Sequence, residues 1–127
     1  MMDGLQHRLT AELLGEGLSV EITAKGGSMR PFIRDGDLVE VTPCDGDQLR
    51  RADVAAYLTR GDGLRLHRVW GRRDAVLCVK GDAHSGAGEE VAAGRVVGKV
   101  TRVTRDGRRC RTWRWGWLVW GWKVFTG

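Results

Sequence analysis

The sequence predicts a mainly β protein: a coiled antiparallel sheet or partly open barrel, preceded by a short N-terminal helix. Short segments in which apolar and polar residues alternate recur about every 8–12 residues, which is typical of all-β domains. The 127 residues include 19 glycines and only 2 prolines, a composition that favours many turns between short strands. Strands do not alternate with long helical segments, as they would in a βαβ fold.

The first segment, residues 3–15, is expected to be a helix. Its apolar residues Leu5, Leu9, Leu13 and Leu14 fall near one helical face, and Gly15 is a plausible end. Strands are expected at residues 18–24, 38–41, 54–58, 64–70, 75–80 and 96–104.

Turns separate these strands. Asp62-Gly63 is a hairpin signal, whereas residues 81–90 are rich in glycine and small residues and are expected to form a loop. Alternation along residues 64–69 places Leu64, Leu66 and Arg68 on one face of their strand, with Arg65, His67 and Val69 on the other.

Length and charge predict one domain, residues 1–107, followed by a basic, tryptophan-rich tail, residues 108–127. The net charge is +5, but residues 101–127 alone carry +6, so the first hundred residues sum to −1. Five of the six tryptophans lie in the tail. Indole rings suit both a protein core and the membrane–water interface. The tail is therefore expected either to pack on the core or to bind anionic membranes peripherally, and no specific nucleic acid is expected as a partner.

The three cysteines have neither a metal-binding spacing nor an even count for a disulfide framework. We therefore expect a reducing compartment and neither a metal nor an organic cofactor. No apolar run reaches the roughly 18–20 residues that span a bilayer, and no secretory signal is evident. The expected location is cytoplasmic, with peripheral membrane contact through the tail.

Three polar residues are candidates for catalysis. Ser28 follows two glycines and precedes Pro31, in a turn that can present a nucleophile if a base lies beside it. His67 is a suitable base because its ordinary pKa is about 6.5. Asp82 could orient the imidazole. Taken singly, each also fits a structural role, as a turn serine, a buried histidine and a strand-ending aspartate.

The order of the motifs adds to these observations. Gly-Ser-Met-Arg-Pro (27–31), Gly-Asp-Leu-Val (36–39), a hairpin, Leu-His-Arg-Val (66–69) and Lys-Gly-Asp (80–82) follow one another. This order resembles the signal peptidase I family, which belongs to the same broad group as the LexA-type repressor peptidases. The resemblance covers about residues 20–100 and implies a coiled antiparallel β fold. It implies Ser28 as nucleophile and His67 at the position of the general base, which is lysine in most bacterial members and histidine in the archaeal and endoplasmic-reticulum type.

Three features depart from that family. Gly26 stands where a serine commonly helps to bind the oxyanion, so backbone N–H groups would have to do so alone. The usual aspartates beyond Gly-Asp are missing, which leaves Asp82 as the first choice for the third catalytic member and Glu89 as the second. An N-terminal membrane anchor is not evident. His84 is a less favoured base than His67, and Lys80 and Lys99 are less favoured still.

The sequence therefore predicts a serine endopeptidase that cleaves a leader or signal peptide, bound in extended conformation, through Ser28, His67 and Asp82. The alternatives are a non-catalytic peptide-binding module on a peptidase scaffold and a LexA-like regulator. Only about 17 residues precede the first strand, too few for a helix-turn-helix domain.

Overall fold

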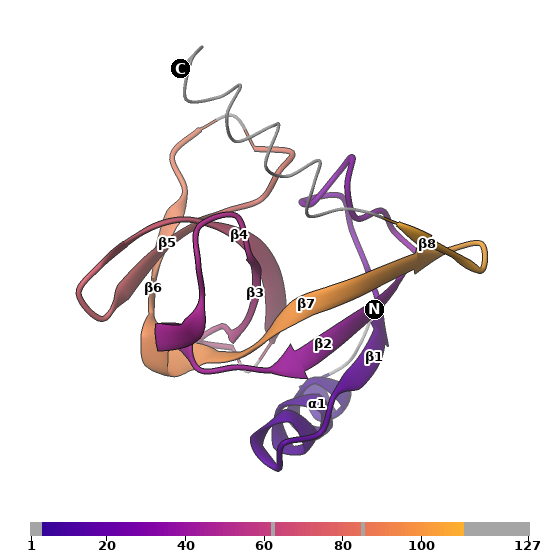
Figure 1. Cartoon of the computed structure of the whole chain (residues 1–127), viewed down its shortest axis with the longest axis horizontal. Helices are drawn as coiled ribbons and strands as arrows, with labels where there is room; N and C mark the ends of the chain where they lie inside the picture. Colours follow the sequence, from indigo (N-terminus) through magenta and orange to yellow (C-terminus); the bar gives the residue numbers. More distant parts are fainter. Residues whose placement is uncertain (1–3, 62, 85, 111–127) are drawn as a thin grey trace.

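The computed structural model describes residues 4–61, 63–84 and 86–110, and it confirms the mainly β prediction. A short helix precedes eight strands that form one antiparallel sheet, which is not closed into a barrel (Figure 1). The elements are α1 (Gly4–Gly15), β1 (Val20–Thr23), β2 (Leu38–Pro43), β3 (Val54–Leu58), β4 (Leu64–Arg73), β5 (Val76–Lys80), β6 (Glu89–Ala92), β7 (Val96–Arg105) and β8 (Arg108–Cys110), with 3-10 turns at Gly46–Gln48 and Ala93–Arg95.

The strand order is β1-β2-β7-β3-β4-β5-β6, and β8 pairs with β7 as a hairpin. Figure 1 shows the long strand β7 joining two parts of the sheet, the β1–β2 ribbon and the curled β3–β6 part. Two elements differ from the prediction. Residues 89–92 form β6 instead of belonging wholly to a loop, and residues 108–110 of the predicted tail form β8. The remaining tail, including its five tryptophans, lies outside the described residues.

Alternation along the strands divides the apolar residues between two cores, because successive side chains point to opposite faces. On β3, Val54 and Ala56 belong to one core, whereas Ala55 and Tyr57 belong to the other. The first core also contains Leu14, Ala24, Met29, Ile33, Val39, Val41 and Val103. The second contains Leu49, Val69, Leu77, Val79, Val91 and Val96.

Strand β4 follows the predicted alternation. Leu64 and Leu66 pack against the first core, and Val69 belongs to the second. His67 therefore lies on the face of the second core, where it pairs with Ala55 of β3.

Helix α1 packs beside β1, β2 and β7 (Figure 1). Of the leucines expected near one helical face, Leu14 is buried, together with Thr10, whereas Leu9 and Leu13 are 51% and 38% exposed. The helix is only three turns long, and its contact with the sheet at Leu14 determines which side is covered. In the described part of the chain, no helix has the length and apolar character needed to cross a bilayer.

Candidate active site

Ser28 lies in the turn that follows β1, and this turn is held from both sides. Gly26 has a φ of +83°, a conformation that favours glycine, and its N–H donates to the Asp35 carboxylate at 2.9 Å. Met29 and Ile33 are buried in the first core, and the Ile33 N–H donates to the Met29 carbonyl. The half-buried Ser28 thus lies between Gly26, which has a positive φ, and the buried Met29.

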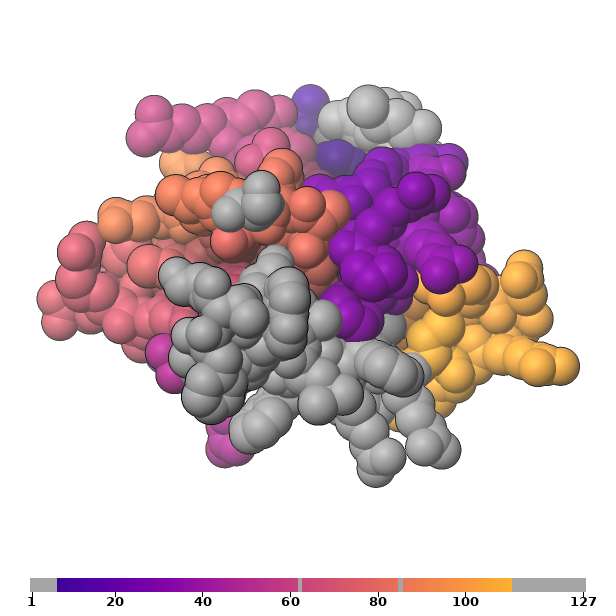
Figure 2. Space-filling view, turned by 90° about the horizontal axis from the view of Figure 1, so that it is seen from above, coloured from indigo at the N-terminus to yellow at the C-terminus, as the bar shows by residue number. Residues whose placement is uncertain are grey.

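The loop after β5 packs directly against this turn. The Ala83 N–H donates to the Ser28 carbonyl at 3.0 Å. A Cβ at Gly81 would lie 2.5 Å from the same carbonyl oxygen, so only glycine allows this approach. Figure 2 shows the segment around residue 30, in purple, against the segment around residue 83, in orange. Residues more than fifty positions apart in the sequence therefore form one surface at Ser28.

Backbone N–H groups at the turn are the available oxyanion donors. Among the hydrogen bonds between described residues, none uses the N–H of Ser28 or Met29, whereas the Gly26 N–H is used by Asp35. A serine in place of Gly26 would be strained at this φ. The turn therefore favours an oxyanion site made from main-chain N–H groups next to the Ser28 side chain.

His67 lies on β4 with only 8% of its surface exposed. Its Nδ1 atom is 3.1 Å from the Tyr57 hydroxyl and 3.7 Å from a Glu89 carboxylate oxygen. Tyr57 is on β3 and Glu89 begins β6, so three strands contribute to the histidine's surroundings. Sequence reasoning missed Tyr57, which looked like an ordinary strand residue, and ranked Glu89 second.

The hydrogen bonds of Tyr57 decide which nitrogen of His67 can act as a base. The Tyr57 hydroxyl donates its single proton to the Glu89 carboxylate, so toward His67 it can only accept. Nδ1 of His67 must then carry a proton and donate it to the hydroxyl oxygen. A neutral imidazole has one N–H group, which places the lone pair on Nε2. Nε2 is therefore the nitrogen that is available to accept a proton.

The pKa shifts of these three groups are consistent with this proton arrangement. Burial lowers the pKa of His67, an effect that the nearby Glu89 carboxylate partly offsets. The hydrogen bond from Tyr57 lowers the pKa of Glu89, and Arg65 lowers it further. Burial and the bond to Glu89 raise the pKa of the Tyr57 phenol. Near neutral pH, the group is thus an ionised Glu89, a protonated phenol and an uncharged imidazole.

Asp82 forms a buried ion pair with Arg68. The guanidinium donates to both carboxylate oxygens, at 2.8 and 2.7 Å, and both side chains are 1% exposed. Arg68 also donates to the Ala52 carbonyl at 2.7 Å and lies 5.6 Å from the centre of the Phe32 ring. This pair ties β4, the 81–84 loop and the end of the Ser28 turn together. Its role in the structure is therefore to hold the site's backbone segments in place.

Arg68 is the second residue that sequence reasoning missed. A sequence signal was present, because strand alternation places this arginine on the same face as Leu64 and Leu66. A charged side chain on an apolar face predicts a buried partner of opposite charge. The sequence did not indicate that Asp82 would be this partner of Arg68.

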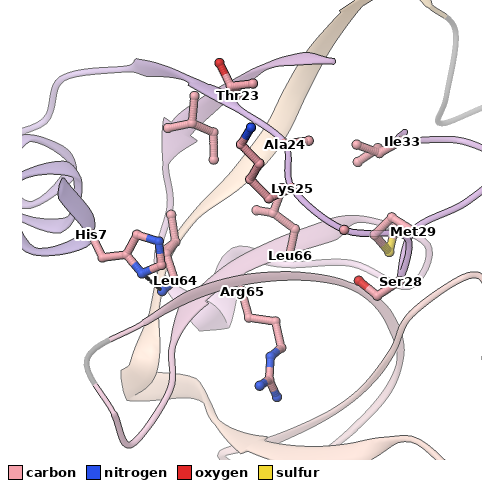
Figure 3. A pocket seen from close by; sticks show the side chains of 12 residues that line it. His7, Thr23, Ala24, Lys25, Ser28, Met29, Ile33, Leu64, Arg65 and Leu66 are labelled. Carbon is pink, nitrogen blue, oxygen red and sulfur yellow. Dashed lines mark hydrogen bonds between the residues drawn. The ribbon is translucent and has the colours of Figure 1, made fainter. Parts of the chain in front are cut away.

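Ser28 and His67 line two adjoining cavities that have Arg65 in common. The first, of about 280 Å³, is bounded by Ser28 and by the start of β4 (Figure 3). The second, of about 230 Å³, is bounded by His67, His84 and Glu89. The two predicted residues are thus connected through the lining of neighbouring cavities, and among the described residues no hydrogen bond joins Ser28 to His67.

The less favoured bases occupy different settings. The exposed His84 lies edge-on to His67, with 6.2 Å between the ring centres, at the second cavity. The Lys80 ammonium lies 5.0 Å from the centre of a Trp70 ring, and Lys99 lies on β7 opposite Ala55. Lys80 and His84 both line the second cavity, and of the three residues His84 alone has a ring contact with His67.

No protein-family model matches the chain, and a search of curated proteins found no match either. Within residues 4–61, 63–84 and 86–110, no group of three or more histidine, cysteine, aspartate or glutamate side chains is arranged to hold a metal ion. The candidate site therefore has to be interpreted from its own geometry.

Proposed function

We propose that this chain is a serine endopeptidase of signal-peptidase-like type that cleaves a leader or signal peptide, with Ser28 as nucleophile and His67 as general base. The observation that carries the proposal is the tautomer of His67, that is, which ring nitrogen carries the proton. Its Nδ1 is engaged by Tyr57 and Glu89, which leaves Nε2 as the proton acceptor, and the cavity lined by His67 shares Arg65 with the cavity lined by Ser28. Glu89, acting through Tyr57, takes the positioning role that the sequence assigned first to Asp82.

In the proposed reaction, the Ser28 oxygen attacks the scissile carbonyl while its proton moves to Nε2 of His67. The carbonyl electrons move onto the oxygen, which the main-chain N–H groups of Ser28 and Met29 stabilise. When the C–N bond breaks, the imidazolium returns the proton to the leaving amine, and the acyl-enzyme forms. Water then hydrolyses the ester by the same steps in reverse order, with His67 again acting as base.

The charge that develops on His67 is balanced locally. As an imidazolium, His67 still donates its Nδ1–H to the Tyr57 oxygen, and the Tyr57 hydroxyl donates to the ionised Glu89. A carboxylate that acts through one intervening hydroxyl can still fix the tautomer and ring orientation, which is the task of the third member in a catalytic triad. Tyr57 and Glu89 are thus positioning residues.

The groove beside Ser28 suits an extended peptide. On β4, pairing with β5 begins at Arg68, so Leu64–His67 has an edge that β5 does not cover. The outward N–H of Leu64 donates to His7 at 2.7 Å, and alternation turns the N–H and carbonyl of Leu66 to the same side. Strand β1 lies at the other border of the groove as an edge strand of the sheet. A substrate strand would pair with these edges through main-chain hydrogen bonds.

The test is labelling by a fluorophosphonate, which reacts readily with an activated serine. We expect the full chain to gain one adduct by intact-mass spectrometry, and we expect Ser28→Ala and His67→Ala to gain none. Ser19→Ala is the matched control, because Ser19 is an exposed serine that bonds the Thr42 hydroxyl. Equal labelling of the wild type and Ser28→Ala would refute the proposal.

The second candidate is a peptide-binding module without catalysis. One observation favours it: Gly26 offers no side-chain donor and its N–H is already used by Asp35, so the oxyanion site has fewer donors. Peptide binding without labelling of Ser28 would support this alternative.

A further inference from the structure

The wall of the Ser28 cavity combines an apolar floor with a basic rim. Six of the lining residues are apolar: Ile22, Ala24, Met29, Ile33, Leu64 and Leu66. Lys25, Arg65 and His7 also line the cavity, and none of its described lining residues is aspartate or glutamate. A volume of about 280 Å³ suits one or two side chains of a peptide better than a cofactor.

The two permanently charged residues come from different elements. Lys25 precedes the Ser28 turn, and Arg65 lies on β4. In the view of Figure 3, the Lys25 ammonium and the Arg65 guanidinium lie on opposite sides of the cavity, with Leu66 between them. A ligand in the cavity would therefore have a cation on either side.

Lys25 and Arg65 differ in whether a carboxylate of the protein lies close enough to neutralise their charge. Arg65 lies 3.2 Å from the Glu89 carboxylate, which also serves Tyr57 and His67. Within the described chain, no carboxylate lies at ion-pair distance from Lys25, which is exposed. Lys25 is therefore the residue whose charge a ligand is best able to complement.

We propose that the groove selects extended peptides in which an apolar residue is directly preceded or followed by aspartate or glutamate. The apolar side chain would fill the cavity, and the neighbouring side chains, which point away from the floor in an extended strand, would reach the rim. Complementary charge at a rim contributes mainly to selectivity and association rate. This inference depends on the proposed function for its ligand, an extended peptide.

The test compares blocked dodecapeptides that differ only by Asp/Asn or Glu/Gln next to a central leucine. Their affinity for the full-length Ser28→Ala variant is measured by fluorescence anisotropy at low and high salt, so turnover is not needed. We expect the acidic member to bind about threefold to tenfold more tightly at low salt, and less so at high salt, as one or two exposed ion pairs allow. Equal affinities for the paired peptides would overturn the inference.

Lys25 variants assign the effect to the rim. In the Ser28→Ala background, Lys25→Gln should lose most of the preference for the acidic peptide over its amide partner, whereas Lys25→Glu should favour a lysine-containing peptide. Arg73→Gln is the matched control, because this exposed arginine at the far end of β4 pairs with Glu90. A preference that stays at full size in Lys25→Gln, or that Arg73→Gln removes equally, would overturn the assignment. Anionic vesicles or a DNA duplex that compete with the acidic peptide as well as unlabelled peptide does would also overturn it.

Failure of this inference can be told apart from failure of the proposed function. Labelling of Ser28 with no acidic preference would refute the inference and leave the peptidase proposal in place. A preference for acidic peptides without labelling of Ser28 would refute the peptidase proposal and leave this inference in place.

Discussion

Replacing Tyr57 by phenylalanine removes one hydroxyl and tests the proposed connection between Glu89 and His67. The change deletes the oxygen that lies 3.1 Å from Nδ1 of His67 and the proton that Glu89 accepts, while the aromatic ring stays in the second core. A hydrogen bond to a charged group contributes about 1.5–3 kcal/mol. If that energy stabilises the imidazolium in the transition state, kcat should fall about 10- to 150-fold, since about 1.4 kcal/mol is a factor of ten.

The assay is steady-state hydrolysis of one peptide by the wild type, Tyr57→Phe, Glu89→Gln and the double variant. KM should change little, because Tyr57 is 2% exposed and has no surface to offer a substrate. The two single losses should not add in the double variant, because the residues act as one unit. A Tyr57→Phe enzyme that keeps kcat within about twofold of wild type, with a normal melting curve, would refute this reasoning.

Three further predictions follow from the site and the tail. Asp82→Asn should lower the free energy of unfolding by about 3–5 kcal/mol in urea titrations, because it leaves the buried Arg68 charge unpaired; a stable but inactive protein would instead restore Asp82 as the residue that orients His67. The kcat/KM of the wild type should rise with pH and reach half its plateau below pH 6.5, because a base must lose its proton and burial lowers the pKa of His67; a midpoint above about 7 would contradict this assignment. Full-length protein should float with acidic liposomes at low salt and not at high salt if residues 108–127 bind the membrane surface, since each basic residue contributes about 1 kcal/mol there; protein that stays at the bottom at low salt excludes this role.

Local patterns in the sequence were enough to predict the class of fold and the direction of the side chains along β4. Alternation along residues 64–69 assigned Leu64 and Leu66 to one face and His67 to the other, because the side-chain period of a strand does not depend on its neighbours. The glycines before Ser28 predicted an unusual turn, and Gly26 indeed adopts a positive φ. These features depend on residues that are close in the chain.

The partners of the site residues were decided only by the tertiary structure. Tyr57 reaches His67 because β3 and β4 pair in one register, and Glu89 joins them because residues 89–92 form a strand against β5. Bulges in the neighbouring β3–β7 and β4–β5 pairings shift the registers of those two pairs by amounts that no local pattern specifies. For the same reason the sequence did not predict that Asp82 would pair with Arg68. A strand's own residues determine which way its side chains point, but hydrogen bonding to its neighbours determines what they meet.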